Sequence, residues 1–197
     1  MKIRGGDLDL IEYEFTSFSP GENIRTCGLQ KDYRLTPVSG TVTVRAPARI
    51  HLAVLDMNRF APDRPGGGGI GFAISVYCTA EVECTDSGTE IDYSREPILR
   101  HFTEVFRQVV GYKGGFKIHA RDHHYEHVGL GSTSTILIAV ANALNAAVGS
   151  PLTSDNLRLL LGSNFVEETV AGNVAFGFET GVGPAASTYG GMAVMGD

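Results

Sequence analysis

The 197-residue sequence contains no tryptophan and only three cysteines. The cysteines, Cys27, Cys78 and Cys84, follow no spacing typical of a zinc site. An odd number of cysteines in a chain of this size favours free thiols in a reducing compartment. A bridge between Cys78 and Cys84 across a hairpin stays open at this stage. We therefore expect a cytoplasmic protein without a cysteine-based metal site.

Long apolar runs and a basic face are also missing. The N-terminus is charged throughout and lacks a signal-peptide core, and the stretch ILIAVANALNAAV is too short to cross a bilayer. Sixteen basic and twenty-two acidic residues give a net charge of -6, which argues against partners such as nucleic acid or a membrane surface. Arg158 is the only Lys or Arg from position 122 onward, so backbone N–H groups must hold most of any anion bound there.

The composition, with 43% apolar and 19% charged residues, is that of one globular domain. Residues 1–40 are polar and turn-rich and are expected to be an N-terminal extension, with the folded domain at 41–197. Alternating or apolar segments predict strands at 41–46, 49–55, 70–77, 79–84, 89–93 and 115–120 and a last strand within 189–197. Helical spacing and capping residues predict helices at 97–110, 132–148 and about 153–162. The order predicts an α+β fold with mostly antiparallel strands.

The most informative segment is EHVGLGSTSTILIAV, residues 126–140, where a strand leads through a glycine loop into a buried helix. Glycines allow close backbone approach to a ligand, and the first turn of a helix offers unpaired N–H groups and a favourable dipole to an anion. Four consecutive hydroxyl residues follow. An ordinary capped helix is the alternative, but helix propensity alone would not select these hydroxyls. The predicted phosphate-binding residues are Gly129, Leu130, Gly131, Ser132, Thr133 and Ser134, with Mg²⁺ predicted at Ser132.

A second candidate segment lies in the first strand and the glycine-rich loop after it. Arg49 and His51 fall on one face of the strand, where they could meet a phosphate, and Asp56 at the strand end could accept a proton or bind a metal. A structural Arg49–Asp56 ion pair and a partly buried structural histidine are the alternatives. The co-occurrence with the glycine loop favours the functional interpretation.

These residues resemble the GHMP kinase superfamily. The short strand motif APxR/K matches Ala46–Arg49, and the helix-start motif GLGSS matches Gly129–Thr133. Within the superfamily the pattern is most similar to the β-ribofuranosylaminobenzene 5'-phosphate synthase family, whose RxHxxxxDxN element is followed by a GG-rich loop, HVGLGS and a late GxG. The matching residues are Arg49, His51, Asp56, Asn58, Gly66–Gly71, His127–Ser132, Gly181, Gly183, Ala185, Ala186, Gly190 and Gly191.

The resemblance implies a two-layer fold like that of ribosomal protein S5 domain 2, with a largely antiparallel sheet and helices on one face. It implies that the glycine loop holds the pyrophosphate of phosphoribosyl pyrophosphate with Mg²⁺, and that an aryl acid such as 4-aminobenzoate accepts the ribose in methanopterin-type cofactor biosynthesis. His51 and Asp56 would be the catalytic residues. The substrate-binding residues would be Arg49, Asn58, Gly68, Gly69, His127, Gly181 and Gly183.

Two other functions remain open, an ATP-dependent small-molecule kinase that uses the same loop for nucleotide phosphates and a non-catalytic ligand-binding domain. The C-terminal domain of the family has no counterpart in this chain, so we expect the chain alone to be inactive. The partner expected in each case is a small phosphorylated molecule, and the sequence leaves open a homodimer.

Overall fold

The computed structural model describes residues 15–55, 66–123, 125 and 130–196. Its main sheet contains β1 (Thr41–Ala53), β2 (Gly69–Thr85), β4 (Gly115–Arg121) and β3 (Thr89–Asp92) in that spatial order. The β7 strand (Met192–Met195) pairs with the first part of β2. Every pair is antiparallel except β3–β4, so the sheet is mixed but mostly antiparallel, as predicted.

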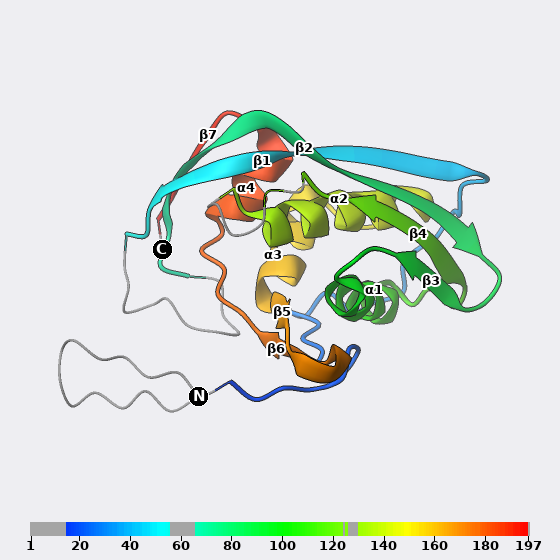
Figure 1. Ribbon diagram of the computed structural model, residues 1–197. Coiled ribbons are helices and arrows are strands. Elements are labelled where there is room, and N and C mark those ends of the chain that lie inside the picture. The colour runs from blue at the N-terminus through cyan, green and yellow to red at the C-terminus, as the bar shows by residue number, and fades with distance from the viewer. Residues whose placement is uncertain (1–14, 56–65, 124, 126–129, 197) are drawn as a thin grey trace.

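The helices form the second layer. These are α1 (Glu96–Val110), α2 (Ser132–Ala147), α3 (Ser154–Ser163) and α4 (Val182–Tyr189), and they lie on one side of the long β1 and β2 strands (Figure 1). A short hairpin of β5 (Val166–Glu168) and β6 (Val174–Phe176) surrounds a 3-10 turn, Val170–Gly172. The predicted two-layer α+β fold is therefore confirmed. In the described part of the chain, no helix is long and apolar enough to span a bilayer.

The two long strands are each predicted as two shorter ones. Pro47 lies inside β1, where the register against β2 shifts between Pro47 and Arg49. Proline cannot donate a ladder hydrogen bond, and a bulge accommodates it without ending the strand. A second shift falls between His51 and Ala53. The two register shifts flank the part of β1 that carries Arg49 and His51.

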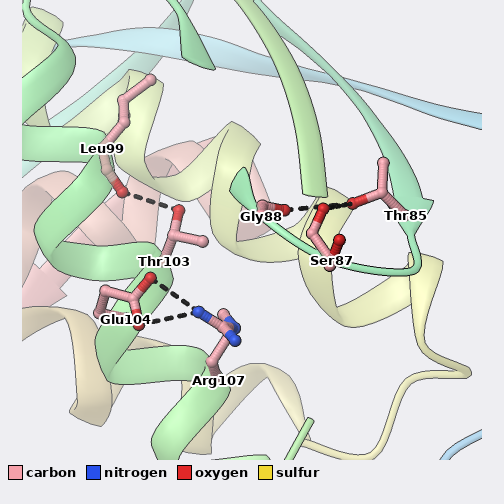
Figure 2. Close-up of polar contacts among 7 residues, drawn as sticks. All are labelled: Thr85, Ser87, Gly88, Leu99, Thr103, Glu104 and Arg107. Carbon is pink, nitrogen blue, oxygen red and sulfur yellow. Dashed lines mark hydrogen bonds and ion pairs between the residues drawn. The ribbon is translucent and has the colours of Figure 1, made fainter. Parts of the chain in front are cut away.

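The α1 helix forms where its apolar spacing predicts it. Pro97 lies in the first turn and Gly111 ends the helix in the left-handed conformation at φ 71°. Figure 2 shows the Thr103 hydroxyl donating to the Leu99 carbonyl at 2.8 Å and Arg107 pairing with the Glu104 carboxylate at 2.9 Å. Thr103 and Leu99 lie on the buried face of the helix, whereas Glu104 and Arg107 form their pair on its partly exposed side.

The N-terminal segment is attached to this domain along its described part. Phe18 is buried, with 8% of its surface exposed, and pairs with Val174 through two backbone hydrogen bonds. Further along, the N–H of Thr36 donates to the Val148 carbonyl at 2.9 Å. Residues 15–40 therefore pack against the 41–197 core, with contacts at strand β6 and at the end of α2.

Candidate functional site

The first turn of α2 provides backbone donors at the predicted glycine loop. Gly131 caps the helix in the left-handed conformation at φ 65°, and no side chain caps it. The N–H of Thr135 makes the first helical hydrogen bond, to the Gly131 carbonyl at 2.9 Å. The N–H groups of the three residues between them precede the intrahelical ladder, and the helix dipole adds positive potential there. A helix start of this kind can accept an anion.

Arg49 brings a cation to the same point. Its backbone N–H donates to the Leu130 carbonyl at 3.2 Å, which links β1 to the glycine loop. Its guanidinium lies against Gly131, since a Cβ added there would stand 2.5 Å from the Arg49 Cζ atom. Burial lowers the pKa of Arg49 and the charge of Glu179 raises it, and an arginine stays protonated in any case. The contact explains why position 131 has no side chain.

Glu179 is a buried acid at this cluster that the sequence analysis did not single out. Glu179 is only 4% exposed. It lies in a glycine-rich stretch of the sequence without other charges. Its carboxylate accepts hydrogen bonds from the Ser134 hydroxyl at 2.7 Å and from the Gly181 N–H at 3.1 Å. Burial raises the pKa of Glu179, while Ser134 and Arg49 oppose that rise. The signal in the sequence was a single acid inside an otherwise apolar and glycine-rich segment.

A second glycine turn, at the start of α4, lies next to these residues. Gly181 caps α4 at φ 84°. A Cβ on Gly183 would stand 3.0 Å from the Ser134 hydroxyl oxygen and 3.4 Å from Arg49 Nε. The start of α4 therefore packs against both the start of α2 and the Arg49 side chain. The fold thus brings together the predicted residues Arg49, Leu130, Gly131, Ser134, Gly181 and Gly183.

His51 stands two residues beyond Arg49 on β1, beside the glycines of β2. Its Nε2 atom lies 2.9 Å from the Ala53 carbonyl, which can only accept, so the proton is on Nε2 and Nδ1 is unprotonated. A Cβ on Gly69 would stand 2.6 Å from His51 Nε2, so this glycine leaves room for the ring. Burial and the Arg49 charge lower the pKa of His51, which keeps the ring neutral at neutral pH.

The hydroxyls at the start of α2 have separate partners. Ser132 begins the helix and is half-buried. Thr133 accepts a hydrogen bond from Arg95 at 2.9 Å and lies 3.4 Å from the Glu167 carboxylate. Ser134 faces inward to Glu179, and Thr135 contacts the Ser187 hydroxyl at 3.4 Å. Ser132 is thus the half-exposed hydroxyl of the first turn, whereas Thr133 and Ser134 are buried.

The other predicted site residues divide into two groups. Gly68 is described and packs against the Met195 carbonyl at the end of β7, where a side chain would collide. The remaining four, Asp56, Asn58, His127 and Gly129, lie outside the described residues. A cleft of about 460 Å³ shares Gly181 with this cluster and is also lined by Thr180, Pro184, Met195 and Arg158, but Arg49, His51 and Gly131 are not among its lining residues. A cleft of this size fits a small molecule.

Part of the chain is similar to a known protein family. Residues 97–191 match the family described as GHMP kinases N terminal domain. The chain contains a GHMP kinase N-terminal domain. The matched span includes Gly131, Glu179 and Gly183, three residues of the cluster described above.

The GHMP domain also has a similar curated relative and similar solved structures. The Beta-ribofuranosylphenol 5'-phosphate synthase of Archaeoglobus fulgidus is 29% identical over 155 residues, which make up 78% of this chain and 44% of the relative. The chain thus spans less than half the length of that relative.

Among solved structures, L. major mevalonate kinase in complex with R-mevalonate aligns with a TM-score of 0.55 at 15% identity, covering 82% of this chain and 51% of the kinase. Methanococcus jannaschii mevalonate kinase gives 0.53 at 15%, covering 81% and 55%. These identities support a shared fold only.

Proposed function

We propose that the start of α2 binds the pyrophosphate of phosphoribosyl pyrophosphate, and that the protein belongs to an enzyme that transfers the phosphoribosyl group to an aryl acid. The observation that supports this most directly is the Arg49 guanidinium packed on Gly131, because it joins a cation to the N–H groups of a helix start. The relative's name, a ribofuranosylphenol 5'-phosphate synthase, points to the same class of product.

In the reaction one new bond forms, between the aryl ring and ribose C1. Two bonds break, and there is no net redox change. The ribose C1–oxygen bond breaks and the electron pair leaves with pyrophosphate. The aryl carbon that carries the carboxylate attacks C1, and the ring–carboxylate bond then breaks to release CO₂ and restore aromaticity. A para amino or hydroxyl group supplies electron density to the attacking carbon. The protein's task is to stabilise the leaving pyrophosphate and a developing oxocarbenium ion.

The residues fit Mg²⁺ bound with the pyrophosphate. Mg²⁺ takes one or two carboxylates and completes its shell with substrate phosphates and waters. Glu167, which also pairs with Arg95 at 2.7 Å, lies 3.4 Å from the Thr133 hydroxyl, and Ser132 adds a hydroxyl at the helix start. The described residues include no group of three or more His, Cys, Asp or Glu placed to hold a metal, so phosphates must supply other ligands. The ion would neutralise charge on the leaving group.

His51 is the proposed contact to the aryl acid. Its unprotonated Nδ1 is an acceptor beside the cationic Arg49, so the ring can accept from an amino or hydroxyl group while Arg49 binds phosphate. We propose Asp56 as the carboxylate that stabilises the oxocarbenium charge, with Asn58 and His127 as substrate contacts and Gly68 and Gly69 as close backbone neighbours. A non-titrating replacement of His51 should affect the aryl acid more than phosphoribosyl pyrophosphate.

The test compares the variants Arg49→Ala and Arg45→Ala in two assays. The first measures binding of phosphoribosyl pyrophosphate. The second measures release of pyrophosphate when phosphoribosyl pyrophosphate is supplied with 4-aminobenzoate or 4-hydroxybenzoate. Arg45 lies on the same strand, exposed and stacked on Tyr77 at 4.4 Å, so it controls for loss of one positive charge. We expect Arg49→Ala to weaken binding by about 100-fold and Arg45→Ala by no more than about twofold.

Three results would overturn the proposal. Equal losses in both arginine variants would show only a general charge effect. Phosphorylation of a small alcohol by ATP, with no binding of phosphoribosyl pyrophosphate, would assign a kinase. Binding of a phosphorylated ligand with neither reaction, when the chain is also supplied with any further domain encoded with it, would assign a ligand-binding role.

A further inference from the structure

The anion site contains a negative charge of its own. Glu179 is buried and accepts from Ser134 in the first turn of α2, and its charge acts on Arg49, whose guanidinium lies against Gly131 at the same helix start. A bound phosphate and the Glu179 carboxylate therefore compete for the same guanidinium. Two negative charges near one buried cation are costly, because little water screens them.

We propose that Glu179 is the resident counter-ion of Arg49, and that it takes up one proton from solvent when a dianion binds at the start of α2. Glu179 is a positioning residue in this scheme, since it acts through Arg49 and Ser134. With the site empty, the carboxylate balances Arg49 and keeps its guanidinium against Gly131. With an anion present, the bound charge replaces that of Glu179, and the protonated acid keeps its hydrogen bonds within the cluster. This inference rests on the proposed anion site.

The surroundings of Glu179 favour this exchange. Its carboxylate accepts from Ser134 and from the Gly181 N–H, two contacts that a neutral acid can partly retain. Burial already raises the pKa of Glu179 and the Arg49 charge opposes the rise, so an anion that screens Arg49 raises it further. The charged and titratable groups of the described residues that face this cluster are Arg49 and His51 of β1, while the first turns of α2 and α4 contribute none.

The sign of the pH dependence follows from linkage. If binding takes up a proton, the affinity for the anion falls as the pH rises above the pKa of Glu179 in the empty site. The reason is that the proton concentration, on which the binding equilibrium then depends, falls with rising pH. His51 would give the same sign if it gained its proton on binding. The two origins are separated by replacing each residue with glutamine, which cannot titrate.

The experiment is a titration of the full chain with sulfate, which remains a dianion throughout, at about pH 6 and about pH 8. We expect the wild-type dissociation constant to rise about five- to tenfold between these values. Glu179→Gln should bind sulfate as tightly at the higher pH as at the lower, and His51→Gln should keep the wild-type slope. Calorimetry in two buffers of different ionisation enthalpy should show proton uptake by the wild type directly.

A slope that persists in Glu179→Gln, or wild-type binding that takes up no proton, overturns the inference. Absence of sulfate binding by the wild type does so as well. If Glu179→Gln does not fold, Ser134→Ala serves instead, because loss of the donated hydrogen bond should move the midpoint of the pH dependence upward. An unmoved midpoint then counts against the role of Glu179. Pyrophosphate release is measured in a separate assay. If the proposed transfer reaction fails there, the pH dependence of sulfate binding still tests the role of Glu179.

Discussion

Replacing Gly131 with alanine tests the glycine loop with one added methyl group. Gly131 has φ 65°, a conformation that costs an alanine about 1–2 kcal/mol. The new Cβ would also stand 2.5 Å from Arg49 Cζ and 2.6 Å from Nη1, so the guanidinium must retreat by about 1 Å. The variant should therefore lose stability modestly and lose the cation at the start of α2.

The expected loss of affinity follows from the contacts removed. A hydrogen bond to a charged group contributes about 1.5–3 kcal/mol, so displacement of Arg49 should weaken pyrophosphate binding about 10- to 100-fold. Titration calorimetry with pyrophosphate measures this effect, and urea denaturation measures the free energy of unfolding of the same sample. The two measurements separate a local change in the site from general unfolding.

Gly111→Ala is the matched control. Gly111 ends α1 at φ 71°, nearly the same conformation, and a Cβ there would meet no atom within 4 Å. Both variants should lose similar stability, but only Gly131→Ala should lose affinity. Wild-type affinity in a folded Gly131→Ala protein, or an equal loss in Gly111→Ala, would refute the assignment of the anion site to the Arg49–Gly131 contact.

Three further predictions concern the buried polar groups. Burial lowers the pKa of His101 from 6.5 to about 4, so its neutral form stabilises the fold above about pH 6.5, and the free energy of unfolding should fall by up to about 3 kcal/mol as the pH drops to about 4. His101→Gln should reduce that acid dependence in urea denaturation, and an unchanged dependence would assign it to other groups. Asn145→Ala should lower the free energy of unfolding by about 2–4 kcal/mol in urea denaturation, because the backbone N–H and carbonyl of Leu152 would both lose their partner. A loss below about 0.5 kcal/mol would contradict this prediction. Burial raises the pKa of the Cys78 thiol to about 12, so mass spectrometry after mild alkylation should find it unmodified in the folded protein, and rapid native labelling would show that strand β2 opens there.

Local signals account for the helices that the sequence predicted. The spacing of apolar residues in α1 and the Thr153 side chain that accepts from the Asn156 N–H at 3.2 Å at the start of α3 both act within one or two turns. Such effects depend on neighbouring residues and can be recognised from sequence. The α4 helix was not predicted, because Gly183 and Pro184 have low helix propensity and only packing against α2 and β1 compensates for them.

Strand length and pairing depended on contacts between distant segments. Pro47 indicated a break between two strands, but β2 pairs with residues on both sides of it and keeps β1 continuous through a bulge. The β5 and β6 strands have three residues each, too few for a periodic pattern to predict them. They form by pairing with each other, and Phe18 adds a further bridge to Val174.

The sequence by itself determined the α+β order, the buried α2 helix and a glycine loop suited to an anion, because these depend on residue type and near neighbours. Only the tertiary structure decided which cation and which acid meet at that loop. Arg49 reaches Gly131 because the end of β1 is hydrogen-bonded to the loop at Leu130, and Glu179 reaches Ser134 because α4 packs on α2. Long-range packing sets these contacts, and a buried carboxylate is stable there only because the same packing supplies the donors that solvate it.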